Sequence, residues 1–562
     1  MRAILKCKTD LLWFGGIGTY IRAGSESDAD VGDRANDPIR IAVADVRAAV
    51  IGEGANLGVT QKGRIEFASR GGRINTDFID NSAGVNTSDQ EVNIKIALSD
   101  AMRAGKLVRS ERNALLAAMT DDVAAASLDN NYQQSLALSL AERRSARELA
   151  DYALLMRSLE ARGLFERALE ALPSDAALGE RGRVGRGLTR PELAVLLSYA
   201  KIALQHDLLD SPVPDEPQLA TSLGDYFPHE LRRRFADELQ RHSLRREIIA
   251  LGLTNAIVDR AGPTMVVRLT DETSCTAANV AHAFLAAREV FSLPSLWRRI
   301  DALDGVVKGA TQLALYQATQ DLVTQQTFWF LHDGDVLVDL AGTIGRHRAG
   351  IKALQPALDD ILSAPEKALY DRDARRLIEG GVPADLAADV ARIEVLKLAP
   401  AITVIAEETG VPAPAAAATY LTIGENLRAR QLAAKAAAIA APDYYDRLAI
   451  AQALTQLADA QARMTRQALG AVPIGSRALT ETWLSQQGER FDRVKRTLKD
   501  VADERSLTIA RLSVVAGQLA ELTTAMTGAP AASPRWVPAE GHSRSPASET
   551  APARKPVRRP RY

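Results

Sequence analysis

The 562-residue sequence has few cysteines, almost no net charge and no long apolar run. Its two cysteines, Cys7 and Cys275, lie far apart, which excludes a disulfide framework and a paired-cysteine metal site and favours a reducing compartment. The 69 basic and 70 acidic residues give a net charge of −1, so no overall field attracts nucleic acid or an anionic membrane. Charged residues interrupt every apolar stretch before the roughly 20 residues that a membrane-spanning helix needs. We therefore expect a cytoplasmic protein without nucleic-acid or membrane partners.

The sequence also lacks the usual signatures of metal and serine-nucleophile chemistry. None of its seven histidines stands in a spacing that would bring two of them to one metal, and no G-x-S-x-G turn occurs. We therefore predict no metal site and no nucleophilic serine.

The pattern of apolar and polar residues changes after about residue 95. Before it, short apolar runs such as LLWF, IRIAV, AAVI, RIEFA and FID alternate with glycine and asparagine clusters, which is typical of strands leading into turns or short helices. After it, long Ala/Leu/Arg-rich stretches have helical spacing. The pattern predicts an α/β segment followed by a mainly helical region.

One helix start is specific, because Thr189 as N-cap, Pro191 in the first turn and Glu192 as the third helical residue form a capping box. Leucines recur behind it at helical intervals, as they do in two later sets that begin at Phe491 and Leu512. We interpret these stripes as packing surfaces. The β-branched run MVVRL at residues 265–269 instead predicts a strand or an extended crossing.

Two further segments, one rich in arginine and one rich in Pro, Ala and Ser, are interpreted as exposed to solvent. Arginines at positions 232–234, 245 and 246 alternate with acidic residues, which favours an ion-paired helix face over a site for an anionic effector. Residues 528–562 are Pro/Ala/Ser-rich and end in basic residues, which predicts a disordered basic tail.

The stretch AAVIGEGANLGVT ends an apolar run in glycines spaced G-x-G-x-x-x-G, from Gly52 to Gly58. This is close to the dinucleotide-binding fingerprint, which needs a strand, the glycine turn, an immediately following helix and an acidic residue about 20 positions further on. Here Gly63, Gly71 and Gly72 leave little room for that helix. We therefore expect these glycines not to form a pyrophosphate turn.

Two other segments end in a similar way. DLLWFGGIGTY predicts an apolar strand followed by Gly15 and Gly16, and TDFIDNSAGVNTSDQE predicts a strand, a glycine turn and the start of a helix. In a doubly wound sheet, ligands lie outside the carboxyl ends of the strands, where glycine permits close approach and asparagine offers both a donor and an acceptor.

The motifs DLLWFGGIGTYIRA, GEGANLGVTQKGRIEFASRGGRINTDFIDNSAGV and TSDQEVNIKI resemble the large bacterial NAD-specific glutamate dehydrogenases, and the likeness continues through LTRPELAVLLSYAKI and HSLRREII. The resemblance covers roughly residues 9–527. It implies the C-terminal half of a Rossmann-like NAD-binding domain over residues 1–98 and a helical C-terminal domain over residues 99–527.

The resemblance also implies residues that contact NAD. In glutamate dehydrogenases an E-G-A-N segment presents its asparagine to the nicotinamide nucleoside, which implies cofactor contacts for Asn56 and Gly54. Gly15 and Gly16 would line the cofactor groove, although smaller members of the family carry a different motif there.

The family pattern N-A-G-G-V-x-x-S appears here as NSAGVNTS, with Ser in place of Ala and Ala in place of the first Gly. The match implies that Asn81 lies near the nicotinamide, while Val85 and Ser88 face the glutamate side chain. Each asparagine and the serine also has a structural alternative. Asn56 could cap a turn, Asn81 could hold a left-handed turn, and Ser88 could N-cap its helix within an S-x-x-E box.

The resemblance implies NAD-dependent oxidative deamination of L-glutamate to 2-oxoglutarate and ammonia by a homo-oligomer. The family's catalytic lysine and aspartate match no motif here, so we assign no catalytic residue and expect Lys62 and Lys95 on the surface. We also expect the chain to be the C-terminal part of a longer enzyme and inactive alone. The alternative is a non-catalytic helical scaffold or regulatory fragment, because most of the sequence is amphipathic helix.

Overall fold

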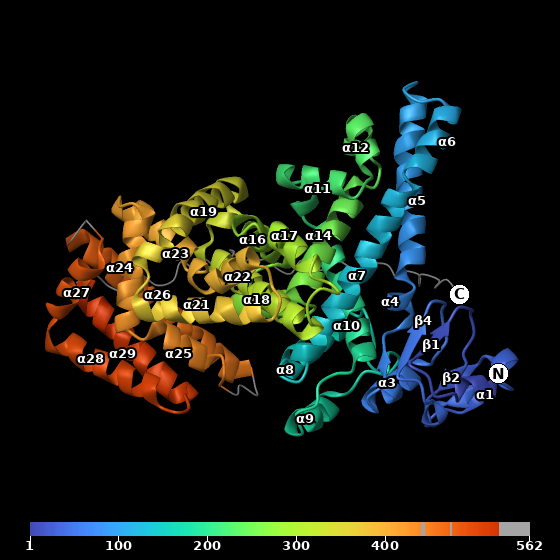
Figure 1. Cartoon of the computed structure of the whole chain (residues 1–562), viewed down its shortest axis with the longest axis horizontal. Helices are drawn as coiled ribbons and strands as arrows, with labels where there is room; N and C mark the ends of the chain where they lie inside the picture. The colour runs from blue at the N-terminus through green and yellow to red at the C-terminus, as the bar shows by residue number, and fades with distance from the viewer. Residues whose placement is uncertain (440–443, 472–474, 528–562) are drawn as a thin grey trace, which may run out of the picture.

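The computed structural model of the chain describes residues 1–439, 444–471 and 475–527. The molecule is elongated, with the strands at one end and helices continuing to the other (Figure 1). This arrangement confirms the prediction of a small α/β segment followed by a mainly helical region. The predicted tail over residues 528–562 lies outside the described residues.

The main sheet has three parallel strands in the order β1 (Leu11–Phe14), β4 (Val50–Glu53), β5 (Arg73–Ile74). A second, two-stranded parallel pair joins β2 (Ile21–Arg22) to β3 (Ile41–Ala42). Because parallel strands present their carboxyl ends at one edge, the segments that follow β1, β4 and β5 meet there. The sequence motifs at all three strand ends are therefore neighbours in space.

The connection from β4 to β5 contains α3 (Gln61–Ser69), so the expectation that the glycines leave no room for a helix was wrong. Thr60 caps the helix, since its hydroxyl accepts a hydrogen bond from the Gly63 N–H at 3.0 Å. Glycine is needed at position 63, in the first turn, because the Cβ of any other residue would lie only 2.8 Å from the Thr60 hydroxyl oxygen. The helix ends before Gly71, whose φ of +93° allows the turn into β5.

The FID run, expected to be a strand, forms the short helix α4 (Asp77–Asp80), which is followed by α5 (Ser82–Arg103). The carboxylate of Asp77 explains the turn, because it accepts the backbone N–H of Phe78 at 2.9 Å and that of Leu57 at 2.9 Å. The RIEFA run, also expected to be a strand, lies in α3.

The rest of the described residues are mainly helical. The other helices up to residue 209 are α1 (Arg2–Leu5), α2 (Asp28–Val31), α6 (Arg109–Ala118), α7 (Thr120–Arg144), α8 (Leu149–Ala161), α9 (Asp175–Arg183) and α10 (Arg190–Leu209). Those from residue 220 to 333 are α11 (Ala220–Asp225), α12 (His229–Arg234), α13 (Ala236–Gln240), α14 (Arg245–Ala261), α15 (Met265–Thr273), α16 (Ala277–Val290), α17 (Leu293–Asp301) and α18 (Gly309–Asp333). The last are α19 (Leu340–Leu354), α20 (Leu358–Ile361), α21 (Ala364–Glu379), α22 (Ala384–Leu396), α23 (Ala399–Thr409), α24 (Ala413–Asn426), α25 (Ala429–Ala436), α26 (Tyr444–Ala471), α27 (Arg477–Ser485), α28 (Gly488–Asp503) and α29 (Ile509–Thr527).

The capping box at the start of α10 is confirmed, since Glu192 accepts the Thr189 backbone N–H at 2.6 Å. The strand expected at residues 265–269 was wrong, because this segment begins α15. Met265 and Leu269 are both buried and stand one helical turn apart, so tertiary burial outweighs the β-propensity of the valines between them.

Hydrophobic side chains of the described residues gather in three clusters. One lies under the sheet, between residues 5 and 74, and a large one runs through the helices from residue 79 to 469. The third lies between residues 423 and 522 and contains the leucine stripes of α28 and α29. The stripes are thus packing surfaces, as predicted. The predicted domain boundary at residue 98 falls within α5.

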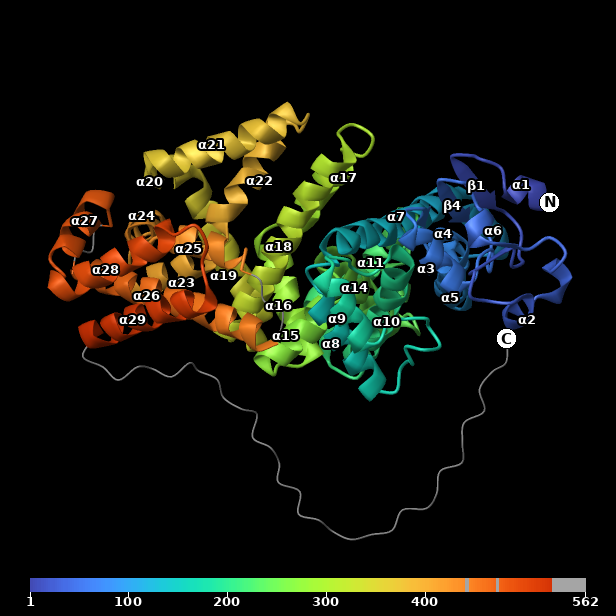
Figure 2. The ribbon, with the colours of Figure 1, turned by 90° about the horizontal axis from the view of Figure 1, so that it is seen from below.

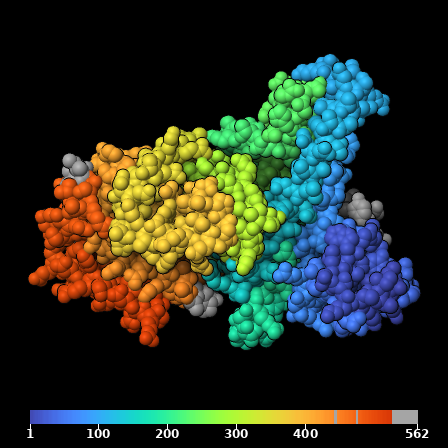
Figure 3. Space-filling model, in the orientation of Figure 1, coloured from blue at the N-terminus to red at the C-terminus, as the bar shows by residue number. Residues whose placement is uncertain are grey.

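Different views show how the helices are grouped. Seen from below, α17 and the α20 to α22 group project from the same side of the molecule (Figure 2). In the space-filling view, the N-terminal lobe lies at one end, beside the helical body (Figure 3). Within the described ranges, no helix is both long and apolar enough to cross a membrane.

Candidate functional site

Two asparagines that lie 25 positions apart in the sequence meet at the carboxyl edge of the sheet. Asn56 lies in the loop after β4, and Asn81 lies between α4 and α5. The side-chain amide of Asn81 donates a hydrogen bond to Oδ1 of Asn56. Asn56 is exposed and Asn81 half-buried, so the pair also faces solvent. The structure therefore brings together two residues predicted from separate motifs.

The turn that carries Asn81 is held from α7. Asn131 of α7 donates its side-chain N–H groups to the Ile79 carbonyl at 2.8 Å and to the Ser82 hydroxyl at 2.9 Å. These bonds fix the backbone on both sides of Asn81. The position of the asparagine pair therefore depends on the helical body as well as on the sheet.

Val85 and Ser88 lie four and seven positions after Asn81, which places all three on one face of α5. Both are exposed. The opposite face packs on α7, where Asn86 donates to Asn130 at 3.1 Å. Ser88 lies inside α5, which begins at Ser82, so the alternative that Ser88 is the N-cap was wrong. The predicted residues share the face of α5 directed away from α7.

The glycines at the strand ends differ in how much space surrounds them. Gly15 and Gly16 follow β1, are exposed, and have nothing within 4 Å of the position of an added Cβ. An added Cβ at Gly54 would lie 2.3 Å from Trp13, whose indole covers both Gly54 and Gly52. The close approach at Gly54 is therefore made by a side chain of the same sheet, whereas Gly15 and Gly16 border open space.

A buried ion pair anchors the loop that carries Asn56. Arg64 of α3 donates to both carboxylate oxygens of Glu53, at 2.7 and 2.9 Å, and Glu53 is completely buried. One of these oxygens also accepts the Val59 backbone N–H at 3.0 Å. Burial raises the pKa of the Glu53 carboxyl, and the hydrogen bonds from Arg64 oppose that shift.

Two further carboxylates hold the same loop. Asp80 accepts the Glu53 backbone N–H at 2.9 Å, and Asp77 accepts that of Leu57 at 2.9 Å. Asp77 also lies 3.2 Å from Arg64. Burial raises the pKa of Asp80, against hydrogen bonds from Asn75 and from the Glu53 backbone. Carboxylates therefore fix the backbone on both sides of Asn56 and leave its side chain exposed.

The network continues into the helical body through Arg190, the first residue of α10. Arg190 donates to Oδ1 of Asn75, and Asn75 donates to Asp80 at 2.6 Å. The same guanidinium donates to the Ser139 hydroxyl and to the Ser135 carbonyl of α7, both at 3.0 Å. No local sequence motif indicates that Arg190, Asn75 and Asp80 form this network. The one signal was Glu53, a carboxylate at the end of an apolar strand.

Other sequence predictions can be placed on the structure. Lys62 and Lys95 are exposed, as expected, and Lys95 pairs with Glu91 at 3.0 Å. The arginine-rich segment is an ion-paired surface, since Arg232 pairs with Asp225 at 2.8 Å and Arg233 with Glu230 at 2.9 Å. Across the described part of the chain, no group of three or more His, Cys, Asp and Glu side chains could hold a metal ion.

The arrangement can bind a polar, planar group. The paired amides of Asn56 and Asn81 offer hydrogen-bond donors and acceptors at the carboxyl edge of a parallel sheet, where ligands of such sheets bind. The small residues after β1 leave room beside them.

Two family models match the chain. Residues 1–141 match the model described as "Bacterial NAD-glutamate dehydrogenase, catalytic domain", and residues 185–521 match "Glutamate dehydrogenase, C-terminal". The second match alone covers more than half of the 562 residues. The chain belongs to the bacterial NAD-glutamate dehydrogenase family.

Individual family members agree with this. A relative from Pseudomonas aeruginosa named NAD-specific glutamate dehydrogenase is 44% identical over 427 residues, which is 76% of this chain and 26% of the relative. A relative of the same name from Mycobacterium tuberculosis is 37% identical over 529 residues, which is 93% of this chain and 32% of the relative. The chain spans about a quarter to a third of the length of these curated relatives. The family predicted from the motifs is confirmed.

Proposed function

We propose that this chain takes part in the NAD-dependent oxidative deamination of L-glutamate to 2-oxoglutarate and ammonia. The observation that carries the proposal is the contact between Asn56 and Asn81 at the carboxyl edge of the parallel sheet. The names of the relatives support NAD and glutamate as the ligands. In this proposal the chain acts as part of a longer enzyme, as a homo-oligomer in the cytoplasm.

The three-stranded sheet would form half of a Rossmann-like NAD-binding domain. Asn56 and Asn81 would orient the nicotinamide nucleoside through their amides, while Gly15, Gly16 and Gly54 border the cofactor. NAD, when bound, supplies the acceptor for the hydride that leaves the α-carbon of glutamate. The contribution of these residues is to hold the two reactants in one geometry, which lowers the entropic part of the barrier.

Val85 and Ser88 would form the substrate side of the same site. They share one exposed face of α5 with Asn81, so a ligand that contacts the asparagine can reach both. The Ser88 hydroxyl would donate a hydrogen bond to the γ-carboxylate of glutamate, and Val85 would contact its methylene groups. Because the substrate's carboxylate is charged, the hydroxyl contributes a charge-assisted hydrogen bond.

A chimera tests the proposal. This chain would replace the matching segment of the Pseudomonas aeruginosa relative, and NADH absorbance would be followed with L-glutamate as substrate. We expect turnover, and we expect Asn56→Ala to lower kcat/KM for NAD by an amount that corresponds to about 1 to 3 kcal/mol.

Asn130→Ala is the matched control, because Asn130 makes the same kind of amide contact on the opposite face of α5. It should leave kcat/KM for NAD unchanged. A folded, monodisperse chimera without turnover, or equal effects of the two substitutions, would contradict the proposed role of Asn56.

The second candidate function is a non-catalytic helical scaffold. It is favoured by the two large hydrophobic clusters that the helices build away from the sheet. A scaffold would restore assembly of a truncated relative, measured by light scattering, without any dependence of turnover on Asn56 or Asn81. The Asn56→Ala variant of the chimera therefore separates the two candidates.

A further inference from the structure

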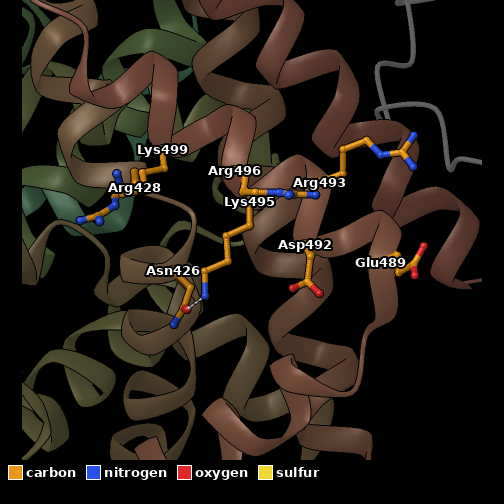
Figure 4. Close-up of a pocket in the computed structure, with 8 residues that line it drawn as sticks. All are labelled: Asn426, Arg428, Glu489, Asp492, Arg493, Lys495, Arg496 and Lys499. Atoms are coloured by element: carbon orange, nitrogen blue, oxygen red, sulfur yellow. Dashed lines mark hydrogen bonds between the residues drawn. The ribbon is translucent and has the colours of Figure 1, made fainter.

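A polar groove runs along α28, at the end of the molecule opposite to the sheet (Figures 1 and 4). We call it the α28 groove. It has a volume of about 690 Å³. Its lining residues, from the junction of α24 and α25 and from α28, are Asn426, Arg428, Glu489, Asp492, Arg493, Lys495, Arg496 and Lys499. No aromatic or aliphatic side chain is among them, so the groove is suited to a charged ligand.

The lining carries five cationic side chains and two carboxylates. Figure 4 shows that the carboxylates of Glu489 and Asp492 lie toward one end, while Arg428 and Lys499 lie toward the other. The chain as a whole has a net charge of −1, so this excess of positive charge is local. A groove of this kind concentrates anions at its cationic end.

Two of the five cations are already engaged. Lys495 donates to Oδ1 of Asn426 at 2.6 Å, and Lys499 pairs with Asp503 at 2.9 Å. Among the described residues, no side-chain hydrogen bond or ion pair engages the guanidinium groups of Arg493 and Arg496, although both are exposed on α28. These two guanidiniums are therefore available to a ligand.

Arg428 stands on the opposite wall from α28, with a φ of +55°. This left-handed conformation is unfavourable for a residue with a long side chain. It makes Arg428 the N-cap of α25, so that the N-terminal turn of an eight-residue helix also borders the groove. A helix N-terminus favours negative charge, which adds to the guanidiniums.

We propose that the α28 groove binds a chain of phosphates, such as that of a nucleoside triphosphate or of inorganic polyphosphate. Arginine is suited to this ligand because its planar guanidinium donates two parallel hydrogen bonds to phosphate oxygens. Arg493 and Arg496 are three positions apart on one helix, so both can contact one chain of phosphates. Arg428 lines the same groove toward its other end and adds positive charge there (Figure 4). The inference is independent of the proposed function at the strand ends.

Calorimetric titration of the full chain tests the proposal, with sodium tripolyphosphate and with ATP as probes at one fixed ionic strength. We expect one equivalent of tripolyphosphate to bind, and we expect Arg493→Gln/Arg496→Gln to weaken binding on the order of tenfold or more, since each lost contact is charge-assisted. Arg428→Gln should act in the same direction. The affinities of the two probes distinguish the sources: tighter binding of ATP indicates a nucleotide, and equal binding indicates the phosphate chain alone.

Arg490→Gln is the matched control, because Arg490 is exposed on α28 but does not line the groove. It should leave the affinity unchanged. If the double substitution lowers the melting temperature, Arg496→Lys is used in its place, because lysine keeps the positive charge but lacks the planar guanidinium. Weaker tripolyphosphate binding by Arg496→Lys would then support the site. Absence of binding to the unmodified chain, or equal weakening by Arg490→Gln, would overturn the proposal.

Discussion

Arg64 and Glu53 form a two-point ion pair, at 2.7 and 2.9 Å, beneath the loop that carries Asn56. Glu53 is the last residue of β4 and Arg64 lies in α3, so the pair joins the end of the strand to the helix that follows it. A buried ion pair therefore supports the loop that carries the exposed Asn56. The residue proposed to contact the ligand, Asn56, is therefore distinct from the buried residues that position it, Glu53 and Arg64.

Arg64→Met should destabilise the sheet region strongly. Removing one partner of a buried pair leaves an uncompensated charge, which costs about 3 to 5 kcal/mol. Hydrogen exchange of β4 and α3, followed by mass spectrometry, measures the effect locally. Arg70→Met is the control, because Arg70 is exposed and makes only an i,i+4 pair with Glu66. Adding Glu53→Gln to Arg64→Met should recover part of the loss, and a failure to recover any would show that the charge is not its cause.

Arg190→Ala should loosen the strand ends without unfolding the helical body. The substitution removes the link from α7 and α10 to Asn75, and through it the support of Asp80. Hydrogen bonds from a charged group contribute about 1.5 to 3 kcal/mol, so exchange in residues 73–80 should accelerate on the order of tenfold or more. Arg186→Ala, at an exposed position nearby, should change nothing. Equal protection in both variants would mean that the sheet is held in place by other contacts.

His347 should make the helical body sensitive to acid. It is completely buried between Trp329 and Phe330, and its Nε2 lies 3.2 Å from the Arg346 guanidinium. Burial, and then the charge of Arg346, lower the pKa of His347 from 6.5 to about 4, against a smaller opposite effect of Asp335.

The folded state therefore favours the neutral ring, and the unfolded chain takes up the proton more readily between pH 6.5 and about 4. Stability from this residue is complete above pH 6.5 and is lost as the pH falls, by up to ~3 kcal/mol. Melting temperatures across this pH range should fall less steeply for His347→Leu than for the unmodified chain. His206→Leu, at an exposed position, should keep the original slope, and identical slopes for all three would contradict the assignment.

The sequence could indicate Asn56, Asn81 and Ser88 as members of a candidate site because each of them stands in a local motif. Asn56, Asn81 and Ser88 follow glycine-rich or helix-starting segments, and the parallel sheet that unites them was predicted from the same segments. The positioning residues could not be predicted in this way. Arg190 and Asn75 are 115 positions apart, and no local pattern indicates that they meet.

The errors in secondary structure have a common cause. α3 was missed because glycine was weighed as a helix breaker, although Gly63 is required by the contact with Thr60. α15 was missed because its valines favour strands, whereas burial of Met265 and Leu269 decides its conformation. In both segments tertiary contacts outweigh local propensity.

Ser88→Ala, made in the chimera with the Pseudomonas aeruginosa relative, separates a substrate contact from a structural role. The structure sharpens this test because Ser88 lies inside α5, where its hydroxyl caps nothing. Alanine favours a helix interior by up to about 0.5 kcal/mol relative to serine, so the melting temperature should stay equal or rise slightly. If the hydroxyl donates to the γ-carboxylate, KM for glutamate and for 2-oxoglutarate should rise on the order of tenfold, while KM for NAD stays the same.

Ser99→Ala is the matched control for this prediction, because Ser99 is exposed on the same helix and its hydroxyl donates only to the Lys95 carbonyl, at 2.6 Å. It should reproduce the change in stability and leave every KM unchanged. A Ser88→Ala variant with the same kinetics as Ser99→Ala would remove Ser88 from the substrate side. The candidate site would then consist of the residues next to the nicotinamide, Asn56 and Asn81, which the hydrogen bond between their side chains holds together.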